Sequence, residues 1–509
     1  MCQVSDRGKV VTCDLGGLHV IPAHEMDDDI HVLRITAPAE QPNELTIEGM
    51  FTRFTALEEV LDLSHNNISA LQDSDFLDLS ELRLLNVSHN QIAQVSSSES
   101  PFRFLANLTT LDLSENRLEA LTPGFFDGLQ RLQRLDLGGN PLMSLDPDSL
   151  KDLRPLRELG LARCQLSRLP PIVYQHLPNL ESLDLQCYRR ARFYDQISRK
   201  LAGQPIEQLA PEEFRHLPGL RILRLDGNRL KRIPEYVLAG NALSRLGLAR
   251  NQLSVLSPCA FCNSSIEDLD MSHNALLSGD GDPLMPLAAS LDRLDLSWNP
   301  LFGDSAAALV RSLGRLRVLR LDGLGLRHLP LETFAGVPAL RELGLRHNRF
   351  RSLPPGLLAP LRSLQSLDVA FNRLRGLSPE TVSELDSLPE LSRLAAHDNP
   401  WQCDECNVGE LSRWLAHRGL NCCGPCPTCA GPPNLADQPL ASLPKEGLQP
   451  CTESVELQRL SRARSQVRQA FLYSRENRLR VYAARGSQQN KRRILAIPLC
   501  GTLHANTRA

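Results

Sequence analysis

Residues 108–131 read LTTLDLSENRLEALTPGFFDGLQR, and the same phrase recurs along most of the chain. Leu111 and Leu113 alternate with Asp112, and this period of two predicts a short strand with the leucines inward and Asp112 toward water. Asn116 follows, and its amide has donors and an acceptor for backbone groups of its own and the neighbouring copy. One copy cannot bury its apolar face alone, so the pattern predicts a solenoid of stacked copies.

The copies are regularly spaced. After a degenerate first repeat near Ile30, most steps between equivalent turn positions are 23 to 26 residues. The longest step, from Tyr188 to Asn228, contains a basic insertion near residues 189–213. Its Arg-Arg-Ala-Arg sequence resembles a proprotein-convertase site, and the alternative interpretation is that the insertion is a solvated basic loop. The turn positions are Asn66, Asn90, Asn116, Asn140, Cys164, Tyr188, Asn228, Asn251, Asn274, Asn299, Leu324, Asn348, Asn372 and Asn399. We therefore predict an α/β solenoid, a curved horseshoe with a parallel concave sheet.

Composition excludes several classes of protein. The chain is 42% hydrophobic but only 5% aromatic, so its core is made of leucine. A net charge of −3 argues against a nucleic-acid binder. The sequence contains no run of about 20 apolar residues, so it predicts no membrane span. Met1 is followed at once by Cys2 and polar residues, without a signal peptide, so we expect the true N-terminus to be missing.

The sequence divides into four segments. We predict an N-terminal cysteine cap at 1–29, about 15 repeats at 30–398, a second cysteine-rich cap at 399–451 and a basic tail at 452–509. In the second cap, the spacing of Leu411, Trp414 and Leu415 predicts a helix that packs on the last coil. The tail has twelve Lys or Arg against three Glu, and we expect a disordered or weakly helical segment that touches acidic partners.

The repeat, the N-terminal Cys-x10-Cys with Leu-x-x-Ile-Pro, and the C-terminal Asn-Pro-Trp-x-Cys with Cys-x-Gly-Pro-Pro resemble extracellular leucine-rich repeat proteins with cysteine-rich flanking caps. Slit-like, Toll-like and leucine-rich adhesion receptors share this plan. The resemblance covers residues 2–451. It implies a leucine-rich repeat solenoid that recognises other proteins outside the cell or on its surface, and it implies the disulfides Cys403–Cys429 and Cys406–Cys451. Cys2 and Cys13 are placed to close a hairpin over the first coil.

The cysteines leave a second interpretation open. The pairs Cys403-x-x-Cys406 and Cys423-x-x-Cys426 have a good zinc spacing, which would suit an intracellular leucine-rich repeat scaffold. The N-terminal cysteine pair favours disulfides instead, because zinc at the other end does not explain it. Cys259 and Cys262 are close enough in sequence to bond. The sequence does not fix the pairing of Cys164, Cys187, Cys259, Cys262, Cys422, Cys423, Cys426 and Cys500.

No catalytic, cofactor-binding or phosphate-binding motif occurs, so we expect neither an enzyme nor a cofactor. Four histidines precede turn positions in phrases such as Leu-Ser-His-Asn, and we interpret them as a repeat feature rather than a metal site. They are His65, His89, His273 and His347. The sites that match the glycosylation pattern are Asn67, Asn86, Asn107 and Asn263.

The concave strand residues are the predicted partner surface, because a solenoid presents them as one continuous face. Their charges come in blocks, acidic toward the N-terminus and mixed with arginine blocks further on. Trp298 and Phe371 precede turn positions where most repeats have small, polar or histidine residues, and aromatic and Arg side chains are enriched at binding hot spots. The candidate residues for binding a protein ligand or co-receptor are Arg224, Arg245, Arg250, Trp298, Arg317, Arg320, Arg341, Arg346 and Phe371.

Overall fold

A computed structural model describes most of the chain up to residue 449. The described residues are 2–5, 9–38, 40–47, 49–95, 99–146, 148–187, 205–210, 213–279, 282–418, 421–422, 425–443 and 448–449. The repeats belong to one compact unit, residues 1–403 with 407–448. A second unit contains residues 404–406 and everything from 449, and within it Asp404 bridges Gln449. Most of the basic insertion, the whole basic tail and Cys451 and Cys500 lie outside the described residues.

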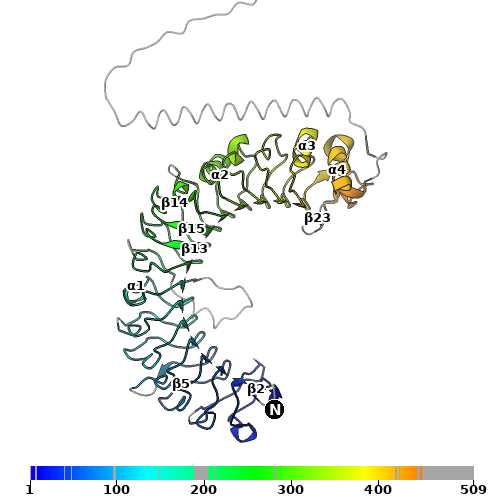
Figure 1. Ribbon diagram of the computed structural model, residues 1–509. Helices are drawn as coiled ribbons and strands as arrows, with labels where there is room; N and C mark the ends of the chain where they lie inside the picture. Colours follow the sequence, from blue (N-terminus) through cyan, green and yellow to red (C-terminus); the bar gives the residue numbers. More distant parts are fainter. Residues whose placement is uncertain are drawn as a thin grey trace, which may run out of the picture. The chain divides into compact units, whose positions relative to one another are not determined.

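The repeat unit is a leucine-rich repeat solenoid, as predicted, with short strands on the inner side of its curve (Figure 1). Its main sheet has 18 strands among the described residues. β1 (Gln3–Ser5) pairs antiparallel with β2 (Val10–Cys13), and all other neighbours in this sheet are parallel. The others are β3 (Val32–Ile35), β4 (Val60–Asp62), β6 (Leu84–Asn86), β8 (Thr110–Asp112), β9 (Arg134–Asp136), β10 (Glu158–Gly160), β11 (Ser182–Asp184), β12 (Ile222–Arg224), β13 (Ala242–Gly247), β15 (Ser265–Asp270), β17 (Arg293–Asp295), β18 (Val318–Arg320), β19 (Glu342–Gly344), β20 (Ser366–Asp368), β21 (Arg393–Ala395) and β23 (Asn421–Cys422).

Shorter elements complete the coils. Three two-stranded parallel sheets are β5 (Ala70–Leu71) with β7 (Gln94–Val95), β14 (Val255–Leu256) with β16 (Ser278–Gly279), and β22 (Trp401–Gln402) with β24 (Cys429–Gly431). The α-helices are α1 (Pro171–His176), α2 (Gly303–Val310), α3 (Pro379–Asp386) and α4 (Glu410–Arg418). Single-turn segments are η2 (Ala23–Glu25), η4 (Met285–Leu287), η5 (Leu331–Phe334), η6 (Glu405–Gly409) and η7 (Leu440–Ser442).

The turn asparagines join successive coils. Asn116 Nδ2 donates to the carbonyls of Val87 and Leu113 at 2.9 and 3.0 Å, and its Oδ1 accepts from the Ile92 amide at 3.0 Å. Asn116 is buried, so these bonds satisfy backbone groups that water does not reach. Cys164 replaces asparagine in one coil, where it is a buried free thiol whose Sγ lies 3.4 Å from the Leu137 carbonyl. Burial raises the pKa of this thiol to about 12, so Cys164 is a structural residue.

Disulfides hold both ends of the repeat unit. Cys2 bonds Cys13 and Cys403 bonds Cys429, with sulfur–sulfur distances of 1.96 and 1.95 Å, which match the expected pairs. Cys406 and Cys426 are also disulfide-bonded, and the pairing of Cys406 with Cys451 stays a prediction. A disulfide sulfur is not a thiolate ligand, so the structure favours the disulfide cap over the zinc alternative. Cys259 and Cys262 also form a disulfide.

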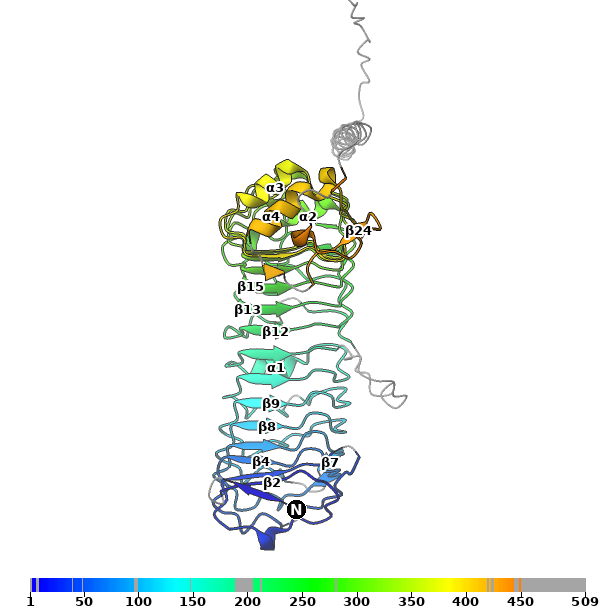
Figure 2. The same ribbon diagram turned by 90° about the vertical axis from the view of Figure 1, so that its right-hand side faces the viewer.

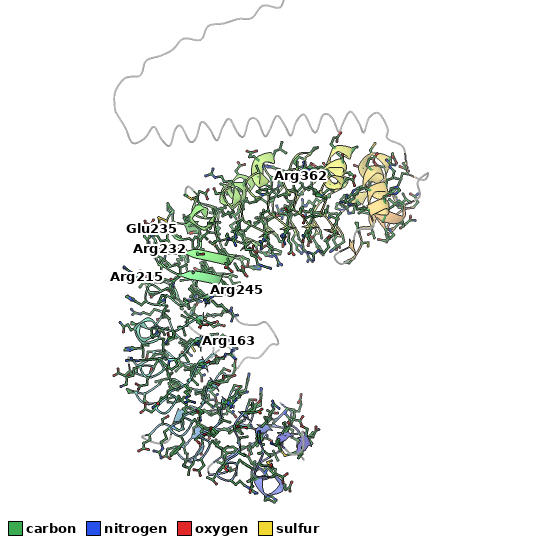
Figure 3. The ribbon with its side chains drawn as sticks, viewed as in Figure 1. Arg163, Arg215, Arg232, Glu235, Arg245 and Arg362 are labelled. Atoms are coloured by element: carbon green, nitrogen blue, oxygen red, sulfur yellow. A yellow bond between two sulfur atoms is a disulfide. The ribbon has the colours of Figure 1, made fainter. Side chains whose placement is uncertain are left out.

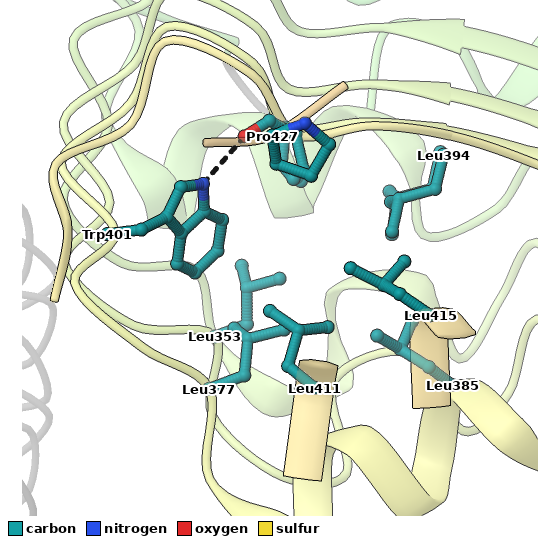
Figure 4. A pocket seen from close by; sticks show the side chains of 11 residues that line it. Leu353, Leu377, Leu385, Leu394, Trp401, Leu411, Leu415 and Pro427 are labelled. Atoms are coloured by element: carbon teal, nitrogen blue, oxygen red, sulfur yellow. Dashed lines mark hydrogen bonds between the residues drawn. The ribbon is translucent and has the colours of Figure 1, made fainter. Parts of the chain in front are cut away.

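The C-terminal cap closes the leucine core by apolar packing. Leu411 and Trp414 of α4 are buried, as predicted. The Trp401 indole donates to the Ala396 carbonyl at 2.9 Å. Leu411 and Trp401 also line a cavity of about 10 Å³ whose walls are leucines, Val369, Ala396 and Pro427 (Figure 4). Such a small apolar space neither holds a ligand nor attracts a water, so it is a packing feature.

Candidate functional site

The side chains of the residues that directly precede the turn asparagines project from equivalent positions on successive coils. Figure 2 looks onto the main sheet, where the parallel strands end along one edge, and these residues follow that edge. The non-glycine residues at this position have φ between +53° and +63°, including His65, His273, Trp298, His347 and Phe371. Left-handed backbone at each coil directs these side chains alike, so neighbours along the solenoid can stack.

Five rings form a continuous row on the C-terminal coils, which we call the aromatic row: His273, Trp298, His347, Phe371 and His397. His273 stacks on Trp298 with ring centroids 5.7 Å apart and planes at 9°. Trp298 meets His347 at 5.6 Å, and His347 stacks on Phe371 at 4.3 Å. Phe371 then meets His397 edge-on at 5.2 Å.

Gly323 makes this row possible. It occupies the same position on the coil between Trp298 and His347, with φ +67°. A Cβ there would lie 2.5 Å from the Trp298 ring, so only glycine lets the indole cross this coil and reach His347. The sequence singled out Trp298 and Phe371, whereas His273 and His347 were interpreted only as a repeat feature and His397 was not singled out. The repeat position that His273, Trp298, His347 and Phe371 share was the signal that they would stack.

The row is polar and cationic on its flanks. The Arg346 guanidinium lies 4.7 Å from the centre of the Phe371 ring, a cation–π contact. His397 is buried and its Nδ1 lies 2.5 Å from the Asp398 carboxylate. Burial, and then the nearby Arg250 charge, lower the pKa of His273. The His273 ring is therefore neutral at physiological pH and stacks on Trp298 as an uncharged aromatic.

Exposed apolar side chains are frequent on the coils around Trp298. Of the eleven large hydrophobic residues that are exposed in the described part of the chain, five lie between residues 255 and 302: Val255, Leu277, Met285, Trp298 and Phe302. Trp298 is 47% exposed, Leu277 50% and Phe302 68%. The sequence reading missed Leu277 and Phe302, although both stand three residues after a turn asparagine, where other repeats have mainly polar or charged residues. Exposed apolar clusters of this kind mark interaction sites.

The predicted arginines do not form one cluster. Three of them pair with acidic residues of a neighbouring coil: Arg224 with Asp184 at 3.4 Å, Arg245 with Asp268 at 3.6 Å, and Arg317 with Asp292 at 3.2 Å. Arg250, Arg320 and Arg341 are exposed. Figure 3 shows Arg245 on the inner side of the curve. Of the predicted arginines, Arg346 contacts the Phe371 ring of the aromatic row, and Arg250 lies close enough to His273 to lower its pKa.

The acidic residues of the inner face have a structural task. Asp62, Asp112, Asp136 and Asp184 each accept a hydrogen bond from the backbone amide two residues later, at 2.8 to 3.0 Å. Asp322 instead accepts from the Arg346 amide of the next coil at 2.8 Å. Burial raises the pKa of Asp322 to about 6. These carboxylates fix the turn after each strand, so the acidic block is not by itself a binding surface.

The glycosylation candidates differ in access. Asn67 and Asn263 are exposed and have positive φ. Asn86 lies in β6, where its Oδ1 accepts from the Ser88 amide at 3.0 Å. The Asn107 amide bonds both Glu81 and Arg131. Asn67 and Asn263 are therefore the better placed acceptors.

The described residues contain no group of three or more His, Cys, Asp or Glu side chains arranged to hold a metal ion. Among them, no helix combines the length and apolar character that crossing a membrane requires. What remains prominent is a capped solenoid with an aromatic and apolar surface beside its strands, the form of a leucine-rich repeat binding module.

Comparison with known proteins agrees with this class. The leucine-rich repeat family profile matches residues 48–92, 95–142, 106–166, 314–374 and 341–399. Mouse podocan-like protein 1 is 32% identical over 61% of this chain, and the chain spans about half (52%) of that relative's length. The matched residues are leucine-rich repeats, in agreement with the solenoid, and the chain is similar to extracellular leucine-rich repeat proteins.

Two solved structures share the fold. A leucine-rich repeat protein of Leptospira interrogans superposes with a TM-score of 0.61 at 23% identity, over 82% of this chain and 96% of that one. Toll, in the Drosophila Toll–Spätzle complex, superposes with a TM-score of 0.59 at 21% identity, over 85% of this chain and 63% of that one. At these identities the likeness concerns the fold alone.

Proposed function

We propose that this chain is a non-enzymatic recognition protein of the cell surface or extracellular space, a receptor, adhesion protein or secreted binder, whose protein partner contacts the aromatic row and the apolar residues beside it. The observation that carries the proposal is the exposure of Trp298, Leu277 and Phe302 on neighbouring coils. Large apolar side chains left in water on a rigid frame are favourable to cover, and Trp is among the most frequent hot-spot residues.

Other observations support the location and the mode of binding. Disulfides persist in oxidising compartments, and both caps contain them. Toll was solved in complex with the protein Spätzle, which is a precedent for protein binding by this fold. The alternative, an intracellular scaffold with zinc-bound cysteines, requires Cys403 to be a thiolate, whereas it is bonded to Cys429.

The test compares two matched double variants against a panel of purified extracellular protein domains. Trp298→Ala with Phe302→Ala removes the residues at two repeat positions of one C-terminal coil. His65→Ala with Met143→Ala removes exposed side chains at the same two positions on N-terminal coils, and Met143 is 66% exposed.

A partner found with the unmodified chain should bind the Trp298/Phe302 variant more than tenfold more weakly, because truncating buried aromatic contacts costs about 2 kcal/mol or more. The His65/Met143 variant should bind it as the unmodified chain does. If the N-terminal variant loses the partner and the C-terminal one keeps it, this site assignment is wrong.

A further inference from the structure

Five exposed arginines occupy two repeat positions on three successive coils. They stand on either side of a buried residue: Arg349 and Arg351 flank Phe350, and the next coil repeats this around Leu374. Phe350 and Leu374 are 1% and 0% exposed. Because side chains alternate along extended backbone, burying the central residue turns both neighbours outward. We call this group the arginine ridge: Arg327, Arg349, Arg351, Arg373 and Arg375.

Backbone hydrogen bonds keep the ridge in register. The Arg349 amide donates to the Leu326 carbonyl at 2.7 Å, and the Arg373 amide donates to the Phe350 carbonyl at 2.9 Å. The turn asparagines of the same coils add side-chain bonds, since Asn348 accepts from the Leu326 amide at 3.0 Å. The guanidinium groups therefore repeat along the solenoid at the spacing of one coil, roughly 5 Å at the strands.

The ridge carries uncompensated positive charge. Within the described residues, none of its arginines lies within 4.0 Å of a carboxylate, unlike Arg224, Arg245 and Arg317 of the inner strands. The equivalent positions on N-terminal coils are mostly uncharged, such as Pro141 and Met143. A row of unpaired like charges attracts anions, and guanidinium groups bind oxyanions with paired hydrogen bonds.

We propose that the arginine ridge binds a linear sulfated polysaccharide of the glycosaminoglycan type, lying along the solenoid. The regular spacing suits a polymer with repeating anionic groups. The two best-formed cavities of the described residues, of about 10 and 200 Å³, are not lined by its arginines. An acidic protein segment would instead be expected to anchor side chains in pockets. The choice of polymer rests on the extracellular location proposed above.

Heparin is the probe, with the complete chain produced through a secretory pathway. The ridge variant is Arg351→Ala with Arg375→Ala. The control is Arg232→Ala with Arg362→Ala, two exposed arginines on the outer side of the curve (Figure 3). At physiological salt, the ridge variant should bind heparin at least tenfold more weakly, and the control should stay within twofold of the unmodified chain. Thermal unfolding of both variants should match the unmodified chain, because all four side chains are exposed.

Three further measurements separate the sources of binding. Arg351→Lys with Arg375→Lys should retain more affinity than the alanine variant, because the charge stays but the paired hydrogen bonds do not. Desulfated heparin and poly-glutamate should bind at least tenfold more weakly than heparin. Binding of heparin should fall steeply as salt rises, because salt screens exposed charges.

The proposal is overturned if the unmodified chain does not bind heparin, or if the control loses as much affinity as the ridge variant. Poly-glutamate binding as tightly as heparin would also overturn it, and would point to an acidic protein segment. The Trp298/Phe302 variant should bind heparin normally. Its behaviour therefore keeps this result separate from the proposed protein-binding site.

Discussion

The N-terminal coils, β4 to β11, and the C-terminal coils, β12 to β21, share one frame and differ in what they present. Leu85 lies opposite Leu111 in the first set, and Leu319 lies opposite Leu343 in the second. Asn348 bonds its own and the preceding coil through the same groups as Asn116, at 2.8 to 3.0 Å. The inward positions are thus interchangeable between the two regions.

The outward positions are not interchangeable. On the N-terminal coils, His65 stacks on His89 with centroids 4.3 Å apart, but Glu115 and Gly139 follow at the same position. On the C-terminal coils the aromatic row continues to His397, and the arginines of the ridge on the coils of His347 and Phe371 follow two and four residues after these rings. Because the frame fixes where each side chain leaves the coil, function can change with residue type alone. This difference supports the proposal that both binding surfaces lie on the C-terminal coils.

The largest expected effect tests the shared frame. Leu111→Ala and Leu343→Ala should each cost about 2–5 kcal/mol of unfolding free energy, because each leaves a cavity in the leucine core. Chemical denaturation of both variants measures this. A loss in only one of them would show that the two regions are not built on the same core.

The next effect concerns the junction between the regions. Glu213, between β11 and β12, is 5% exposed, and its Oε2 has no hydrogen-bond partner among the described residues. Burial raises the pKa of Glu213 from 4.5 to about 7, although a hydrogen bond from Ala210 opposes this. The folded state then binds more protons than the unfolded state between these two values. Stability contributed by protonated Glu213 is full below pH 4.5 and is lost as the pH rises to about 7.

Glu213→Gln should remove this pH dependence. At pH 8 the variant should be more stable than the unmodified chain by about 3 kcal/mol, and at pH 4 the two should be equal. Urea denaturation at both pH values is the measurement. A variant that is less stable than the unmodified chain at pH 8 would contradict the burial of an ionisable carboxylate at this junction.

A smaller effect compares one glycine from each region at the same repeat position. Gly139 and Gly323 have φ of +74° and +67°, so alanine at either costs about 1 kcal/mol of backbone strain. At Gly139 the new Cβ meets the movable Glu115 carboxylate, whereas at Gly323 it meets the Trp298 ring at 2.5 Å. Gly323→Ala should therefore cost more than Gly139→Ala. It alone should change tryptophan fluorescence, because it displaces an exposed indole.

The smallest effect concerns the acidic residues of the inner face. Asp112→Ala should cost about 1 kcal/mol, because Asp112 accepts a hydrogen bond from the Ser114 amide at 2.9 Å. Arg351→Ala on the ridge should change unfolding free energy by less than about 0.5 kcal/mol. Thermal or chemical unfolding distinguishes the two. If both variants changed the unfolding free energy equally, the hydrogen bond of Asp112 would not contribute to stability, and the acidic residues would have no structural role.

Much of the fold followed from local pattern. The period-two leucines predicted β8 and its equivalents, and the turn asparagines predicted the coil-to-coil bonds, since both depend on residues within one repeat. The disulfide Cys2–Cys13 was also within reach of the sequence, because both cysteines lie in one short segment. The nine candidate binding residues were a weaker prediction. Three of the arginines pair with carboxylates of neighbouring coils, a contact that no single repeat reveals.

The solenoid, its repeat length and its leucine core could be predicted from the order of residues alone, because the burial of one face of each copy depends only on the order of apolar and polar residues. Which outward side chains meet became clear only in the folded chain. Trp298 and His347 are 49 residues apart, and although both stand directly before a turn asparagine, no single repeat shows that they meet. Their rings lie 5.6 Å apart because Gly323 leaves the space between them open. Because the coils stack, the neighbours of a surface residue lie on the adjacent coils, across the direction of the chain. The contacts that form a surface therefore depend on how the coils align and not on proximity in the sequence.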